Sequence, residues 1–145
     1  MSNKNFGGIE MGNPVFELER IVYDPDGAGA RVTAKIDGRE VIGSSQNYLY
    51  LHPEYRGMVG KYKGNAAIFA VRDAVLTQFG IDVKKPEWNA EADFSEKYDP
   101  GKGDITVKLA NGSHEFQATL PDKGPDSIVF AYAAAINKML EHKQT

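Results

Sequence analysis

The sequence predicts an α+β fold in which a strands-then-helix unit occurs twice. Each half contains a glycine hairpin turn and then an amphipathic helical stretch, and both halves run in the order turn, strand, hairpin, strand, helix. The 145 residues suit a single domain. We expect it over 15–141, with repeat units at about 15–80 and 88–141. The (βββα)2 pattern predicts antiparallel sheet or sheets with two main helices packed on one face. The alternative to a duplicated unit is that common turn sequences recur by chance in the two halves.

The first half contains three predicted strands and a helix. Alternating or β-branched apolar residues place the strands at 15–22, 31–36 and 39–43. Asp37-Gly38 is a strong two-residue hairpin signal. The helix is expected from Asn65, a good N-cap, to Gly80, a good residue for the position after the helix.

The second half repeats this order. Phe94 to Lys97 leads into Tyr98-Asp99-Pro100-Gly101, which mirrors the turn that begins at Tyr23. The remaining elements are a strand at 105–109, the Asn111-Gly112 turn, a returning strand at 113–118, and a helix that begins at Asp126 or Ser127. Trp88 is expected in the crossover that joins the two units.

Composition excludes several classes of function. The net charge of -3 disfavours binding of duplex nucleic acid. The absence of cysteine excludes disulfides and thiolate chemistry, and it suits a reducing, cytoplasmic location. Residues 1–14 are expected to be a flexible leader without a signal-peptide core, and 142–145 a short tail. No apolar run reaches the roughly 20 residues that a membrane span needs.

The segment at about 46–62 interrupts the first unit and is rich in tyrosine and cations. Tyr48 and Tyr50 share one strand phase, and Leu49 and Leu51 share the other, so the segment's start suits an extra strand with leucine inward. An oligomer interface and a platform for a nucleotide or phosphate are the alternatives.

The chain from Phe16 to about Leu140 resembles the C-terminal regulatory and dimerisation domain of 2-isopropylmalate synthase and citramalate synthase. The resemblance rests on four stretches, which are 16–19, 31–43, 63–71 and 103–140. It implies a stand-alone regulatory module that forms homodimers or larger assemblies. The family's catalytic barrel is absent from the chain, so its synthase reaction is not implied. The loops that hold an amino-acid effector in that family are altered at 64–67 and 119–124.

The two helix starts form the candidate ligand site. Their free backbone N–H groups favour an anion, and small residues let a ligand approach closely. We expect an anionic or zwitterionic metabolite there. The residues expected to form the shell and the lid are Gly64, Asn65, Ala66, Lys123, Gly124 and Ser127, with Arg56, Lys61 and Tyr62. Ordinary capped helices are the alternative.

The sequence indicates no cofactor, no metal site and no catalytic constellation. The histidines His52, His114 and His142 lack ligand spacing. Ser44-Ser45 lacks a nucleophile elbow. We therefore predict a non-enzymatic ligand-binding and dimerisation module. The alternative is a module that binds a protein or sequesters a nucleotide signal through the inserted tyrosines and Arg56.

Overall fold

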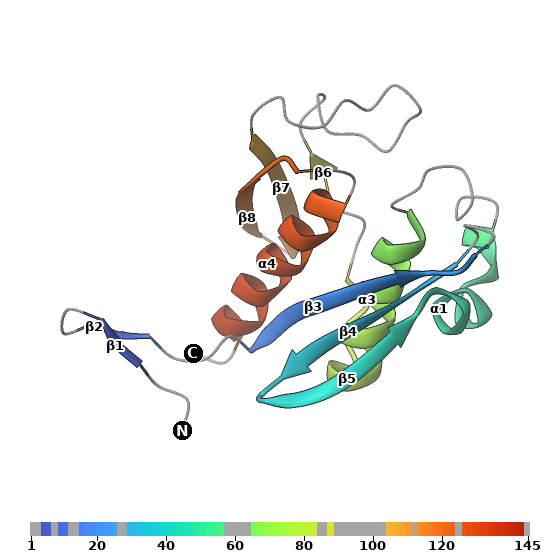
Figure 1. Cartoon of the computed structure of the whole chain (residues 1–145), viewed down its shortest axis with the longest axis horizontal. Coiled ribbons are helices and arrows are strands. Elements are labelled where there is room, and N and C mark those ends of the chain that lie inside the picture. The colour runs from blue at the N-terminus through green and yellow to red at the C-terminus, as the bar shows by residue number, and fades with distance from the viewer. Residues whose placement is uncertain are drawn as a thin grey trace.

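Figure 1 shows a computed structural model of the chain, in which two units of strands and helices lie side by side. The structure describes residues 4–6, 9–11, 15–25, 29–56, 65–83, 87–88, 104–111, 113–123 and 126–143. Three antiparallel strands precede the first long helix, and a second antiparallel sheet precedes the last. The predicted α+β class is confirmed.

The first unit contains an antiparallel sheet in the order β3-β4-β5. The strands are β3 (Phe16–Tyr23), β4 (Ala30–Ile36) and β5 (Arg39–Ser44). The predicted hairpin between β4 and β5 is confirmed, with positive φ at Asp37 (50°) and Gly38 (81°). Helix α3 (Asn65–Phe79) follows. Gly80 ends it with φ of 69° and an N–H that donates to the Leu76 carbonyl at 2.9 Å.

The second unit has the order β6-β7-β8. Its elements are β6 (Glu87–Trp88), β7 (Asp104–Asn111), β8 (His114–Pro121) and α4 (Asp126–Lys143). Trp88 pairs with Val107, so it lies on a short strand and not in a bare crossover. The stretch 94–97, expected to open this unit, lies outside the described residues.

The first 14 residues contain a short hairpin of β1 (Lys4–Phe6) and β2 (Ile9–Met11). The expectation of a flexible leader did not include it. Figure 1 shows this hairpin apart from both units.

The inserted segment begins with a helix, so the prediction of an extra strand was wrong. Helix α1 (Ser45–Leu51) is followed by the 3-10 helix η1 (Pro53–Tyr55). Ser44 caps α1, because its side-chain oxygen accepts the N–H of Asn47 at 3.4 Å. A strand would place Tyr48 and Leu49 on opposite faces, but both are buried, whereas Tyr50 is 76% exposed.

The core lies around α3, and α4 joins the two units. Every residue of α3 from Ala66 to Val75 is buried, which is typical of a helix enclosed on all sides. Helix α4 packs on β7 and β8 of its own unit and on β3 of the other. The Asn137 side-chain oxygen accepts the N–H of Phe16 at 2.9 Å, so it blunts the free edge of β3. No helix among the described residues is long and apolar enough to span a membrane.

Candidate functional site

A buried arginine lies inside the otherwise apolar helix α3. The Arg72 side chain is only 6% exposed. Its Nε, which is also buried, has no hydrogen-bond partner among the residues that the structure describes. Such a group is costly to leave unsatisfied, because burial removes water without supplying an acceptor. Arg72 is therefore the residue around which a candidate site can be built.

Aromatic rings surround the guanidinium. Its central carbon lies 4.8 Å from the ring centroid of Tyr48, 5.4 Å from that of Tyr55 and 5.7 Å from that of Phe69. These distances suit cation–π attraction, which stabilises a desolvated cation. The Tyr48 ring also stacks on Phe69 at 5.6 Å and on His52 at 4.6 Å. Helix α1 and η1 thus supply two of the three rings that the described residues place around a cation carried by α3.

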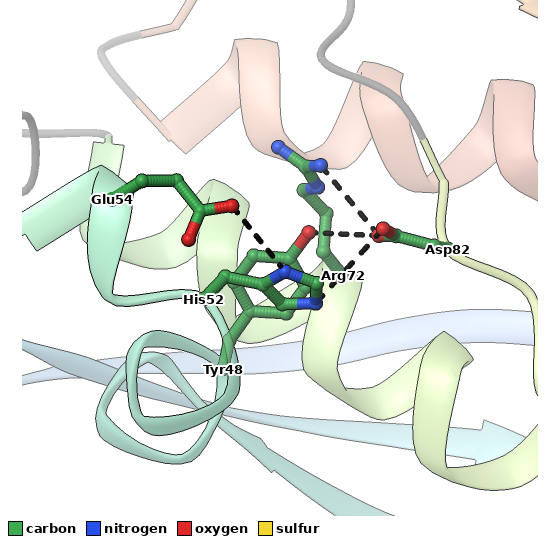
Figure 2. Close-up of polar contacts among 5 residues, drawn as sticks. All are labelled: Tyr48, His52, Glu54, Arg72 and Asp82. Atoms are coloured by element: carbon green, nitrogen blue, oxygen red, sulfur yellow. Dashed lines mark hydrogen bonds and ion pairs between the residues drawn. The ribbon is translucent and has the colours of Figure 1, made fainter.

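Three polar side chains converge on Asp82, which lies just beyond the end of α3 (Figure 2). The Tyr48 hydroxyl donates to Asp82 Oδ1 at 2.7 Å. A terminal nitrogen of Arg72 lies 3.6 Å from the same oxygen, too far for a strong hydrogen bond. His52 Nε2 lies 3.9 Å from Asp82 Oδ2. The Asp82 side chain is 48% exposed, so the cluster contacts solvent at this carboxylate and is buried at Arg72.

The hydroxyls of Tyr48 and Tyr132 remain protonated. Burial, reinforced by the hydrogen bond to Asp82, raises the pKa of Tyr48 well above its usual value. Burial likewise raises the pKa of Tyr132 on α4, although the nearby charge of Arg72 lowers it in part. Both side chains therefore remain neutral over the physiological range and serve as hydrogen-bonding groups.

A buried acid, Asp73, fixes α1 to α3. Asp73 Oδ2 accepts the N–H of Ser44 at 2.9 Å, and its Oδ1 accepts a side-chain N–H of Asn47 at 3.2 Å. Burial raises the pKa of Asp73 despite these donors. Asp73 thus holds the start of α1, the helix that brings Tyr48 over Arg72.

The raised pKa of Asp73 predicts a pH-dependent stability difference between the wild type and Asp73→Asn. The folded state binds the Asp73 proton more tightly than the unfolded state does. The stabilisation that this tighter proton binding gives is complete below the unfolded-state pKa of about 3.9. It is lost as pH rises through the raised pKa of the folded state. We expect the wild type to lose stability relative to Asp73→Asn as pH rises, because other groups titrate alike in both. Urea unfolding across this range measures it, and a difference that moves the opposite way would contradict the assignment.

The structure describes only some of the residues that were expected to form the site. Lys123 and Ser127 are together at the start of α4, where the Ser127 hydroxyl accepts the Lys123 N–H at 2.8 Å. Ala66 is fully buried, and Arg56 is exposed just after Tyr55. Asn65 begins α3, and nothing of its side chain is described. Gly64, Gly124, Lys61 and Tyr62 lie outside the described residues. Of the expected residues, Arg56 is the one next in sequence to a ring of the Arg72 cluster.

A groove of about 360 Å³ lies between β3, β8 and α4. Its lining is largely apolar, and its acidic members are Glu17 and Glu141. Among the described residues that line the groove, Lys138 is the one cation, and it donates to the Gln117 carbonyl at 2.6 Å. Asn137, which also lines it, is used by Phe16. The groove therefore suits an anion less well than the surroundings of Arg72 do.

The side chains of His114 and His142 lie next to each other, although these residues are distant in sequence. The rings of His114 and His142 lie 4.6 Å apart, beside Phe116. Across the residues that the structure describes, no group of three potential ligands could hold a metal ion.

Sequence reasoning missed Arg72, Asp73 and Asp82. The available signal was that Arg72 and Asp73 are the only charged residues in 65–81, a stretch that is otherwise almost entirely apolar or small. Charged residues are almost never fully buried unless they are paired, so two of them inside such a helix indicate a special role. Asp82 carries no such signal, since an acid just after a helix is ordinary.

The chain matches no protein-family model, no curated protein and no solved structure. The resemblance to a synthase regulatory domain therefore stays a prediction.

Proposed function

We propose that the chain is a small-ligand-binding module, and that Arg72 binds the anionic group of an anionic or zwitterionic metabolite. The observation that carries this proposal is the buried guanidinium whose Nε–H has no acceptor within the described part of the chain. A carboxylate or phosphate would supply that acceptor in the two-pronged geometry that arginine favours. The resemblance to a regulatory domain supports the same class of function.

The surroundings of Arg72 favour a small anion over a second protein side chain. The aromatic rings of Tyr48, Tyr55 and Phe69 exclude water, so a hydrogen bond to the guanidinium gains strength there. A ligand would enter past His52 and Tyr55, which are only partly buried. Tyr55 lies on η1, and His52 lies between α1 and η1, two short helical elements whose stability depends on packing. Their displacement is therefore the least costly opening.

Asp82 distinguishes a zwitterion from a simple anion. Its half-exposed carboxylate lies on the same side as the entry, and a ligand ammonium would pair with it. A ligand with only an anionic group would meet repulsion from this carboxylate at the same point. We therefore expect glycine, a minimal zwitterion, to bind more tightly than acetate, which has the same carboxylate alone.

The cluster suits binding more than turnover. Tyr48 has a raised pKa and donates to Asp82, so it is a poor base. Within the part of the chain that the structure describes, no serine or threonine of this cluster lies beside His52 as a nucleophile would. The arrangement offers a cation, an anion and neutral hydroxyls, which together hold a charged molecule.

The test is isothermal calorimetry of the purified chain with phosphate, acetate and glycine as probes, followed by native mass spectrometry of protein purified gently from its own cells. The proposal predicts saturable binding of at least one probe, or a small extra mass on the native protein. Tyr50→Ala serves as the control, since Tyr50 is exposed on the other face of α1 from Tyr48. Absence of any bound mass together with no probe binding would refute the proposal.

A protein- or nucleotide-binding module is the second candidate. The observation in its favour is the exposure of Tyr50 (76%) and Leu51 (56%) next to each other on α1. This candidate predicts that Tyr50→Ala abolishes binding of a nucleotide probe such as AMP while glycine and acetate stay silent. The same calorimetry therefore separates the two functions.

A further inference from the structure

The groove between β3, β8 and α4 lies along an unpaired strand edge. β3 is the outermost strand in the order β3-β4-β5, and no described strand pairs with its other side. Figure 1 shows α4 between β3 and the strands of the second unit. Three successive residues of β3, Phe16, Glu17 and Leu18, line the groove there. An unpaired edge presents backbone N–H and C=O groups with which another extended chain can pair.

The strand register shows which backbone groups face the groove. The Asp37 N–H donates to the Val15 carbonyl at 3.3 Å, so Val15 directs its backbone groups toward β4. Successive residues of a strand direct these groups to alternate sides, so those of Phe16 and Leu18 point away from β4. The Phe16 N–H agrees, since it reaches Asn137 on α4. Asn137 occupies this one donor, whereas no described strand uses the Leu18 N–H or the carbonyls of Phe16 and Leu18.

The two faces of the sheet define the side chains that an added strand needs. Residues opposite Phe16 and Leu18 would place their side chains on the same face as these two buried side chains. Next to that face, α4 lines the groove with Phe130 and Ala134, so the added side chains should be apolar. The residue between them would point to the outer face, beside the exposed Glu17.

The charges on the β3 side of the groove are negative. Glu17 and Glu141 both line it and both are exposed. Glu141 follows Asn137 by one helical turn, so it lies on the same face of α4 as the residue that contacts β3. Lys138 is held on the other side, at the Gln117 carbonyl of β8. A partner that lies along β3 should therefore carry positive charge next to its apolar residues.

We propose that this groove binds an extended peptide segment of another protein, in which apolar and basic residues alternate, as an added strand on the edge of β3. The peptide backbone pairs with the free groups of Phe16 and Leu18, its apolar side chains pack on α4, and a basic side chain lies beside Glu17. In this mode the main-chain hydrogen bonds supply affinity and the side chains supply selectivity. An acidic peptide or a nucleic acid would be repelled by the two glutamates.

The dimensions of the groove limit the affinity. Its volume is about 360 Å³, and a bulge between Leu18 and Arg20 interrupts the edge. About three peptide residues, or roughly 10 Å of strand, fit along it. So short a contact is weak and transient, and we expect a dissociation constant of about 0.1–1 mM. The proposal is independent of the Arg72 site, which is built by α1, η1 and α3.

NMR titration of the full chain with the end-blocked peptide Lys-Val-Lys-Val-Lys tests the proposal. The Leu18 amide signal should move in a saturable manner, because this N–H gains an acceptor. Glu17→Lys is expected to weaken binding at least about fivefold, since attraction becomes repulsion. Glu40→Lys is the matched control, because Glu40 is an exposed residue of β5 in the same sheet and does not line the groove. It should change the dissociation constant less than about twofold.

N-methylated peptides separate strand pairing from simple attraction of a cation, and they leave the protein unchanged. N-methylation of both valines removes the N–H groups that face β3 and should weaken binding at least about tenfold. N-methylation of the central lysine removes an N–H that points away from β3, so binding should persist. A Leu18 signal that stays still up to about 5 mM peptide overturns the proposal. Equal affinities of the two N-methylated peptides, or of Glu17→Lys and Glu40→Lys, overturn it as well. None of these outcomes bears on ligand binding at Arg72.

Discussion

Gly43→Ala is expected to lower the free energy of unfolding by about 3 kcal/mol or more, as severe overpacking does. A β-carbon at this position would overlap the Ala70 carbonyl oxygen and would lie 2.9 Å from the Ala74 β-carbon. Both contacts are with rigid parts of α3, so no flexible side chain can move aside. The helix would have to shift away from β5.

The same shift would reach the candidate site, since Phe69 and Arg72 lie on the stretch of α3 that packs over Gly43. Urea unfolding measures the loss of stability. Gly38→Ala is the control: a β-carbon there meets nothing within 4 Å, although φ is 81°. Its cost is limited to left-handed backbone strain of about 1 kcal/mol. Equal losses in the two variants would show that α3 does not pack on β5 as described.

Arg72→Met is expected to reduce ligand affinity at least about 100-fold while leaving the fold intact. Methionine fills a similar space among the aromatic rings, and replacing a buried charge with an apolar group of similar volume is often neutral. Asp82 is half exposed and retains the Tyr48 hydroxyl, so it does not become a buried unpaired charge. Two charge-assisted hydrogen bonds to the ligand are lost, each of about 1.5–3 kcal/mol.

Arg72→Lys separates charge from geometry. Lysine keeps the positive charge but lacks the planar fork, so we expect an intermediate loss of about tenfold. Arg39→Met, at an exposed position that opens β5, is the matched control and should bind as the wild type does. Calorimetry with the probe that binds the wild type measures the affinity of all three variants, which are Arg72→Met, Arg72→Lys and Arg39→Met. Unchanged affinity in Arg72→Met, with a normal melting temperature, would remove Arg72 from the site.

Local sequence signals predicted much of the fold. The Asp37-Gly38 turn, the end of α3 at Gly80 and the two returning strands are set by residues close to one another in sequence, where backbone preferences decide. The extra strand failed because alternation at 48–51 is too short to separate strand from helix. The Ser44 cap and the contacts of Tyr48 with Phe69 and Asp82 stabilise a helix at this segment. Phe69 and Asp82 both lie more than 20 positions from Tyr48 in sequence.

The site was less predictable than the fold. Small residues and free N–H groups make the helix starts visible in sequence as a possible ligand site, whereas the Arg72 cluster depends on long-range packing. Asp82 approaches Tyr48 across 34 positions, and Tyr132 joins them from α4. Of the polar residues named here, only Arg72 and Asp73 have a sequence signal, because they are charged residues within an otherwise apolar helix.

The most direct test of the anion site is the NMR signal of the Arg72 Nε–H group, assigned by its loss in Arg72→Lys. Titration with the probe that binds most tightly should move this proton downfield in a saturable manner, with the same dissociation constant that calorimetry gives, because the group gains a charged acceptor. A signal that stays still while the probe binds would contradict the account and place the ligand elsewhere on the molecule.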